Sequence, residues 1–298
     1  MGIGLNEILA DDPAARQRYL LLLRSCLTRS LAAGVRYPML RRPLFRESPL
    51  GWALYPLADS LGWQLTKRES ARLRRTGRDW PAEAETMIGE VRLRHLQECV
   101  ESVIGRGIPG DLMETGVWRG GACILMRGVL KAWGDTDRIV WAADSFEGMP
   151  RPDPRYAQDQ SDTHWHHNAV LAVSRNDVEA AFAHYGLLDE QVRFLEGWFR
   201  FTLPIAPVKR LAVLRLDGDM YGSTMDALEH LYPKLSTGGF LIVDDYGAIR
   251  SCRQAVEDYR AKHGIRERVE KIDWTGVFWQ KRTGSESDPS GAGSWKLD

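Results

Sequence analysis

The spacing of apolar residues changes near Gly110, from long segments with helical spacing to short segments of strand and helix that alternate. In the first third, residues 14–33 and 82–105 carry apolar side chains at helical spacing, and prolines interrupt the pattern between them. From Gly110 onward, apolar runs of strand length alternate with amphipathic helical segments. This alternation is typical of a mostly parallel sheet with crossover helices, so the chain is predicted to be an α/β protein with a helical N-terminal extension.

The same pattern predicts the bounds of the elements. We expect strands at 111–114, 138–144, 192–196, 211–216 and 240–243, and helices at 120–133, 176–185, 223–235 and 254–263. Asn176 and Ser223 are the expected N-caps, and Gly264 is the expected C-cap. Residues 268–272 and 276–281 have the pattern of a closing antiparallel hairpin. We expect a helical extension or cap over 1–85, the main domain over 86–283 and a disordered tail over 284–298.

An irregular insertion at 150–169 interrupts the alternation and ends in a histidine cluster. Long irregular stretches inside a compact domain are usually functional or mobile, so we interpret this one as a lid over a binding crevice. His164, His166 and His167 could ligate a transition metal or supply a general base. Loop histidines are more commonly solvated or substrate-facing, and we favour that interpretation.

The composition of the chain argues against several kinds of binding partner and structural site. The 298-residue chain has 40 basic and 40 acidic side chains, and this zero net charge argues against a dedicated nucleic-acid binder. Its four cysteines form no CxxC pair, so neither a structural zinc site nor a disulfide framework is indicated. No secretory signal and no apolar run of membrane-spanning length is evident, so we expect a cytoplasmic protein without a membrane partner.

A glycine-rich turn follows the first strand of the main domain, at residues 114–121 with the sequence ETGVWRGG. Its glycines allow a ligand to approach the backbone closely, but the acid Glu114 would repel a diphosphate. A ligand with a positive ammonium group fits better. Asp144 ends the next strand, where an acid typically accepts hydrogen bonds from ribose hydroxyls. Together these features indicate a nucleoside joined to an amino acid, namely S-adenosylmethionine.

Further acids follow two later strands: Asp217 with Asp219, and Asp244 with Asp245. Ligands of open α/β sheets bind at the carboxyl ends of the strands, so these acids are expected to lie around one crevice. Clustered carboxylates repel one another unless cations or protons neutralise them. We predict that Asp217, Asp244 and Asp245 bind a hard divalent metal such as Mg²⁺. The alternative is a polar rim paired to Arg215, Arg250 or Arg253.

Four segments in order resemble the macrocin O-methyltransferase (TylF) family: 114–121 (ETGVWRGG), 144–150 (DSFEGMP), 216–221 (LDGDMY) and 243–247 (VDDYG). The similarity is continuous from about Met87 to Lys281. Members of this family are metal-dependent, S-adenosylmethionine-using enzymes of natural-product biosynthesis. The resemblance therefore implies a Rossmann-like class I methyltransferase fold and an O-methyltransferase that acts on a small natural product, and we expect the methylated group to be a sugar hydroxyl.

The resemblance also implies residue roles. Glu114, Thr115 and Gly116 would hold the methionine end of the cofactor, and Met87 and Ile88 would close over it. Asp144 would bind the ribose. The remaining roles are adenine contacts for Ser145 and Trp198, magnesium ligation by Asp217, Asp244 and Asp245, and general-base catalysis by Asp217. Gly222 is a departure, because many relatives are expected to carry Glu after the tyrosine.

Two other functions compete with this one. Asp217-x-Asp219 has the spacing with which metal-dependent glycosyltransferases hold a nucleotide sugar, although Glu114 and the pair Asp244–Asp245 argue against that reading. A catalytically silent small-molecule-binding protein is the third hypothesis. The sequence leaves the acceptor and the oligomeric state open, and the helical N-terminal third is a reasonable surface for a homodimer.

Overall fold

The computed structural model describes residues 9–31, 36–38, 66–68, 70–81, 83–160 and 168–282. Within them, a seven-stranded sheet has the order β5-β4-β3-β6-β7-β9-β8. Its parallel strands are β3 (Asp111–Thr115), β4 (Val140–Asp144), β5 (Val192–Glu196), β6 (Leu211–Leu216) and β7 (Leu235–Val243). The closing antiparallel hairpin consists of β8 (Glu270–Lys271) and β9 (Val277–Gln280), which pairs with β7. The mostly parallel α/β fold and its hairpin are confirmed.

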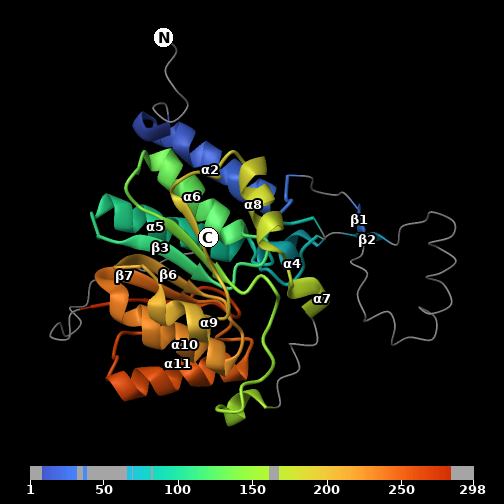
Figure 1. The fold of residues 1–298 in the computed structure, drawn as a ribbon. Helices are drawn as coiled ribbons and strands as arrows, with labels where there is room; N and C mark the ends of the chain where they lie inside the picture. Colours follow the sequence, from blue (N-terminus) through green and yellow to red (C-terminus); the bar gives the residue numbers. More distant parts are fainter. Residues whose placement is uncertain are drawn as a thin grey trace, which may run out of the picture.

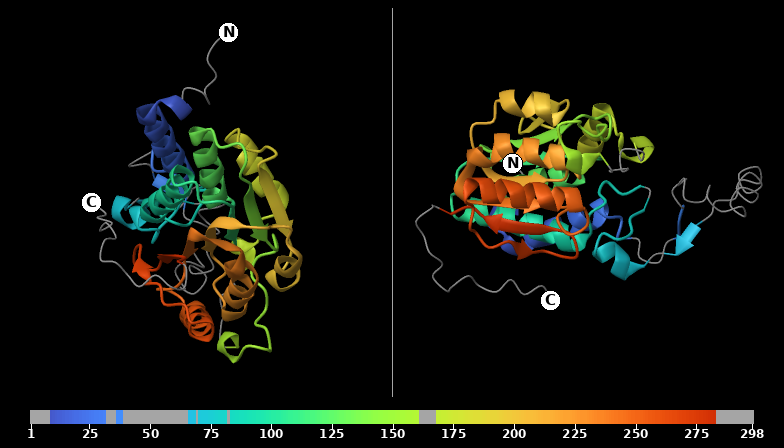
Figure 2. Two further views of the ribbon diagram at one scale, coloured as in Figure 1. Left: turned by 90° about the vertical axis from the view of Figure 1, so that its left-hand side faces the viewer. Right: turned by 90° about the horizontal axis from the view of Figure 1, so that it is seen from below.

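Helices cover both faces of this sheet (Figures 1 and 2). One layer contains α2 (Pro13–Leu27), α5 (Glu90–Gly105), α6 (Gly121–Trp133) and α8 (Arg175–His184), and the other contains α10 (Tyr221–Leu231) and α11 (Arg250–His263). The shorter elements are β1 (Arg36–Pro38) paired with β2 (Thr66–Arg68), α4 (Ala71–Arg75), α7 (Asn168–Leu171), α9 (Phe199–Thr202), and the 3₁₀ turns η2 (Ala157–Asp159), η4 (Leu203–Ile205) and η5 (Tyr232–Lys234).

The order of strands reverses between β3 and β6. After β3 the chain continues to β4 and β5 on one side, and it then returns to β6 and β7 on the other. Gly116 (φ +86°) lies at this junction, where a Cβ atom would be 1.9 Å from the carbonyl oxygen of Asp217. Only glycine allows the two strand ends to approach so closely, and a crevice opens at this switch point.

Some predicted bounds were wrong. The helix predicted over 82–105 begins only at Glu90, because Gly89 packs against the backbone of residues 74–77 and the chain turns there. The N-cap of α8 is Ser174 rather than Asn176. The helix α10 begins at Tyr221 and ends at Leu231, so Ser223 does not cap it. Gly264 (φ +63°) does cap α11, as predicted.

The N-terminal helix α2 shares its hydrophobic core with the main domain. Leu20, Leu23 and Leu27 are buried in the same cluster as residues of α5, α6 and the sheet. The predicted domain boundary near residue 85 stays a prediction, because a hydrophobic core shared across it does not test it. In the part of the chain that the structure describes, each helix is too short or too polar to cross a bilayer. The predicted tail at 284–298 lies outside the described residues.

Candidate functional site

A cavity of about 690 Å³ opens at the carboxyl ends of β3, β4, β6 and β7. It brings together nearly all of the predicted site residues: Met87, Ile88, Glu114, Gly116, Asp144, Ser145, Trp198, Asp217, Asp244 and Asp245. Thr115 is the exception, because this buried residue is not part of the lining. Aromatic side chains complete the wall, among them Trp118, Phe199, Phe201 and Trp274. The cavity therefore combines the acids of the strand ends with aromatic side chains, and further charged residues such as Arg151 and Arg200 also line it.

Asp144 is held by the glycine-rich turn. Its Oδ2 atom accepts a hydrogen bond from the backbone N–H of Val117 (2.7 Å), and its Oδ1 atom accepts one from Phe146 (2.8 Å). Burial raises the pKa of Asp144, and these hydrogen bonds oppose that effect. The carboxylate thus links the end of β4 to the turn after β3, next to the cavity.

Glu114 is buried and contacts Cys123, which the sequence analysis did not identify, and Arg215, which it named only as a partner of the later acids. The guanidinium group of Arg215 donates to its Oε1 atom, and the thiol of Cys123 donates to its Oε2 atom at 3.0 Å. Burial raises the pKa of Glu114 to about 7, although Arg215 opposes the rise. This acid is therefore poised between its charged and neutral forms near neutral pH.

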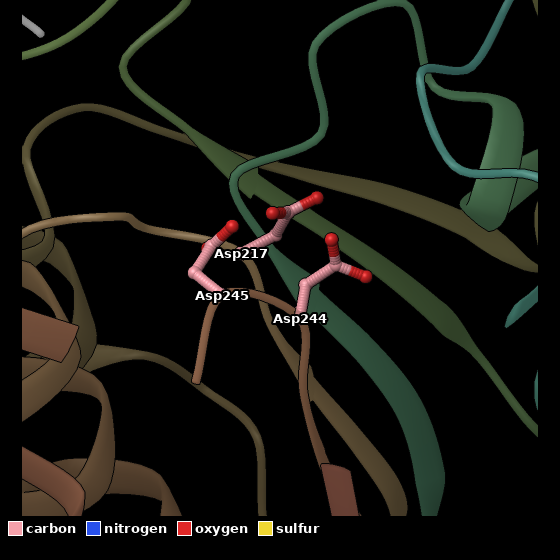
Figure 3. A group of neighbouring side chains, drawn as sticks. All are labelled: Asp217, Asp244 and Asp245. Atoms are coloured by element: carbon pink, nitrogen blue, oxygen red, sulfur yellow. The ribbon is translucent and has the colours of Figure 1, made fainter. Parts of the chain in front are cut away.

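Three carboxylates converge on one point beyond β6 and β7 (Figure 3). Oxygen atoms of Asp217, Asp244 and Asp245 all lie within 4.8 Å of one another. The Oδ2 atom of Asp245 is buried and has no hydrogen-bond partner. Burial, together with Asp219, Asp217 and Asp244, raises the pKa of Asp245 well above its ordinary value. An all-oxygen set with one unsatisfied carboxylate oxygen fits a hard divalent cation such as Mg²⁺.

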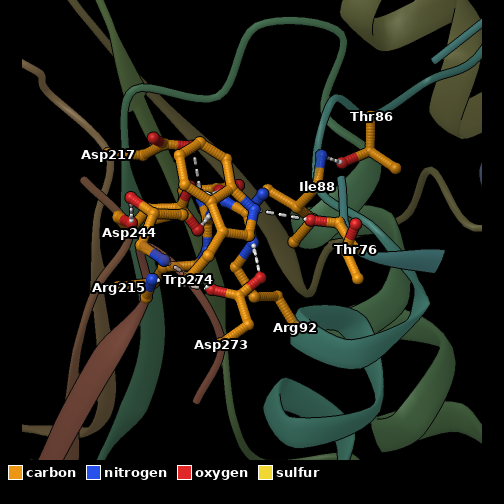
Figure 4. Close-up of polar contacts among 12 residues, drawn as sticks. Thr76, Thr86, Ile88, Arg92, Arg215, Asp217, Asp244, Asp273 and Trp274 are labelled. Carbon is orange, nitrogen blue, oxygen red and sulfur yellow. Dashed lines mark hydrogen bonds and ion pairs between the residues drawn. The ribbon is translucent and has the colours of Figure 1, made fainter. Parts of the chain in front are cut away.

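Two arginines share the same acids (Figure 4). Arg215, whose side chain is 2% exposed, pairs with Glu114, with Asp217 (2.7 Å) and with Asp244. Arg92 of α5 pairs with Asp244 and lies 3.1 Å from Asp273. The arginine-paired rim is thus present alongside the metal-binding geometry.

Arg253, one of the alternative partners that the sequence suggested for these acids, lies over the ring of Tyr246 instead, 4.9 Å from its centre. Asp219 has a left-handed backbone (φ +58°) and lines the cavity, but it does not belong to the group of converging oxygens.

The sequence contained a signal for Arg215. It is a single charged residue within the otherwise apolar strand β6, all of whose residues are buried. A charge buried in such a strand requires partners of opposite sign. Its register neighbours are Glu114 on β3 and Ile242 on β7, so Glu114 is the adjacent acid. Arg92 and Asp273 had no comparable signal, because their contacts join segments distant in sequence.

Residues 150–154 and Asp159 of the insertion line the cavity, which agrees with its interpretation as a lid. The three histidines His164, His166 and His167 lie outside the described residues.

Comparisons with known proteins agree with one another. The model of the macrocin-O-methyltransferase (TylF) family matches residues 16–281. The chain is 60% identical over 210 residues to the 8-demethyl-8-(2,3-dimethoxy-alpha-L-rhamnosyl)-tetracenomycin-C 4'-O-methyltransferase of Streptomyces olivaceus (70% of this chain, 80% of the relative). It is 57% identical over 217 residues to the demethyldecarbamoylnovobiocin O-methyltransferase of Streptomyces niveus (72% and 82%). The solved structure of the O-methyltransferase NovP superposes with a TM-score of 0.78 at 46% identity, covering 90% of this chain and 99% of NovP.

Proposed function

The chain belongs to the macrocin O-methyltransferase (TylF) family and is an O-methyltransferase of natural products, and we propose that it methylates a sugar hydroxyl using S-adenosylmethionine and Mg²⁺. The observation that carries the proposal is the convergence of Asp217, Asp244 and Asp245 beside Glu114 and Asp144 in one cavity. The tetracenomycin relative, whose name specifies a rhamnosyl compound, supports a sugar as the acceptor.

The cofactor half of the proposal assigns roles to the glycine turn and two acids. Glu114 and Gly116 would face the methionine end of S-adenosylmethionine, and Met87 and Ile88 would cover it. Asp144, at the end of β4, would accept the ribose hydroxyls, and Ser145 and Trp198 would lie near the adenine. Thr115 does not line the cavity, and its role would be indirect, since its carbonyl oxygen accepts a hydrogen bond from the backbone N–H of Asp217 (2.9 Å). S-adenosylmethionine, when bound, supplies the methyl group on a positively charged sulfur.

The metal half of the proposal assigns Mg²⁺ to Asp217, Asp244 and Asp245. A bound divalent cation lowers the pKa of a coordinated hydroxyl and offsets the excess of carboxylates. Asp217 is the residue that we assign to the proton of the acceptor hydroxyl. Arg215 holds its Oδ2 atom at 2.7 Å, which orients the carboxylate and leaves Oδ1 for the proton. Aromatic lining residues such as Trp118 and Phe199 would exclude water and hold the acceptor in line.

The glycosyltransferase alternative has less support. Asp219, the second acid of its motif, is not part of the converging group, and the family match is to methyltransferases.

The homodimer also stays a prediction. Leu21 and Leu22 of α2 are 52% and 54% exposed, which leaves apolar surface on the N-terminal third.

The test is a methyl-transfer assay with labelled S-adenosylmethionine and a set of rhamnosylated aromatic polyketides, with their aglycones as controls. We expect label on the glycosylated compounds only, loss of transfer after EDTA treatment, and recovery with MgCl₂. Transfer that survives complete metal removal would rule out the metal role. Equal labelling of the aglycones would rule out the sugar hydroxyl as the acceptor. Calorimetric titration with a nucleotide diphosphate sugar tests the glycosyltransferase alternative. We expect no binding, and binding of the nucleotide sugar would favour a glycosyltransferase.

A further inference from the structure

A segment of the insertion, residues 150–160, lines part of the cavity and contacts the start of α10 at its far end. It follows the loop after β4 and ends at η2, which lies beside α10 (Figure 1, yellow-green). Residues 150–154 and Asp159 line the cavity. This covering segment therefore forms one wall of the site, and its position depends on what holds its far end.

Asp159 at the end of η2 is the residue that makes the far attachment. Its side chain is buried (1% exposed). Its Oδ1 atom accepts a hydrogen bond from the backbone N–H of Tyr221 at 2.7 Å, and its Oδ2 atom accepts one from Gly222 at 2.8 Å. The N-cap residue of α10, Met220, makes no side-chain capping bond. A carboxylate from 62 residues earlier in the chain thus takes the place of a local cap, where the positive end of the helix dipole favours it.

Tyr156 and Gly222 also take part in the packing of the covering segment against α10. The ring of Tyr156 packs on that of Tyr221, with centroids 5.1 Å apart. A Cβ atom on Gly222 would lie 3.0 Å from the Tyr156 ring and 3.2 Å from Oδ2 of Asp159. The glycine at 222 therefore leaves the space that lets η2 sit against the first turn of α10.

The segment is also attached to α9 through Asp153, and this contact is weaker. Asp153 pairs with Arg155 and, at 3.3 Å, with Arg200 of α9. Both arginine side chains are about half exposed (55% and 48%), and exposed ion pairs contribute little. The buried, two-pronged contact of Asp159 is the stronger attachment, since hydrogen bonds to a charged group are stronger than neutral ones.

We propose that Asp159 is a positioning residue: by capping α10 it fixes the covering segment as the acceptor-side wall of the cavity. Its partner helix begins directly after the 217–220 turn, so the same contact sets the wall relative to Asp217. The role of this wall toward the acceptor rests on the proposed function, whereas the attachment itself does not.

The experiment compares Asp159→Asn with Asp12→Asn. Asp12 serves as a capping control at an exposed position, because its Oδ1 atom caps α2 through the backbone N–H groups of Ala14 and Ala15 (2.8 and 3.1 Å), outside the cavity lining. The amide of Asp159→Asn keeps the size but presents N–H to one of the two helix N–H groups. Trypsin cleavage between Arg155 and Tyr156, followed by mass spectrometry, reports release of the segment without any need for turnover.

We expect Asp159→Asn to raise the rate of this cleavage about tenfold and the KM for the acceptor by a similar factor, with the Kd for S-adenosylhomocysteine changed less than about twofold. Asp12→Asn should change none of the three. Gly222→Ala, which crowds Tyr156 and Asp159, should reproduce the pattern if Asp159→Asn fails to fold.

Cleavage of both segment variants at the wild-type rate would overturn the attachment. Faster cleavage with an unchanged KM, or with KM and Kd raised equally, would overturn the role of the wall. If the wild-type enzyme transfers no methyl group, the proposed function fails, and the cleavage rates alone decide whether Asp159 holds the segment.

Discussion

Replacing Arg215 with methionine is the perturbation that examines the electrostatics of the site most directly. The side chain is 2% exposed and pairs with Glu114, Asp217 and Asp244. Removing one partner of a buried ion pair costs about 3–5 kcal/mol, because the remaining charge stays buried without compensation. For a domain of this size that loss corresponds to a fall in Tm of roughly 6–20 °C. We expect Arg215→Met to lower the Tm by an amount in this range when Mg²⁺ is absent.

The charge count predicts a second effect of opposite sign. Five carboxylates (Glu114, Asp217, Asp244, Asp245 and Asp273) face two guanidinium groups, those of Arg215 and Arg92, so the formal charge of the cluster is −3 when every acid is ionised. Loss of Arg215 makes it −4, and a divalent cation is then attracted more strongly. We therefore expect MgCl₂ to raise the Tm of Arg215→Met by more than it raises that of the wild type, while turnover falls because the carboxylates lose their orientation.

The assay is thermal unfolding of both proteins, with EDTA and with saturating MgCl₂, beside Arg127→Met as the control. Arg127 is also buried and pairs with an acid, Asp189 (2.9 Å), but neither residue lines the cavity. Its replacement should lower the Tm without changing the response to Mg²⁺. A magnesium response of Arg215→Met no larger than that of the wild type would refute the idea that arginine and metal neutralise the same acids.

Three other predictions concern single acids. Asp217→Asn should lower kcat by about 100-fold or more, since a general base is lost, while the Kd for S-adenosylhomocysteine stays close to the wild-type value; unchanged kcat would remove Asp217 from the reaction. Asp144→Ala should weaken S-adenosylhomocysteine binding in calorimetric titrations, whereas Asp111→Ala, which removes an acid at the opposite end of the sheet, should not; equal Kd values would place the adenosine elsewhere. The pKa of Glu114, raised by burial from 4.5 to about 7, means that the folded state binds its proton more tightly than the unfolded state. The stability due to Glu114 is therefore full below pH 4.5 and is lost as the pH rises through 7, so urea unfolding of the metal-free protein at pH 5 and 7.5 should show a smaller decrease for Glu114→Gln than for the wild type.

Local pattern was sufficient to predict most of the fold. The strands at 192–196 and 211–216 were predicted to the residue, and the others overlap their predictions. This succeeded because side-chain spacing reflects the geometry of one element and needs no knowledge of its partners. The acids of the site were predictable for a related reason: each ends a strand, and parallel strands bring their carboxyl ends to one edge.

The predicted helix starts were wrong where contacts with a distant part of the chain, and not neighbouring residues, set the start of the helix. Met87 and Ile88 have helical spacing, but they line the cavity in an irregular stretch because Gly89 packs against residues 74–77. The start of α10 was misplaced because its cap, Asp159, comes from a separate part of the chain. Capping rules read neighbouring residues only, so they could not find it.

The amino-acid sequence by itself determined which residues are acidic, which strands they end and which family the chain resembles. Only the tertiary structure decided how that charge is balanced, since β3 and β6 become neighbours only when the sheet forms and places Arg215 between Glu114, Asp217 and Asp244. The energy of a buried charge depends on the partners within a few ångströms of it, and those partners are set by strand order and not by position along the chain.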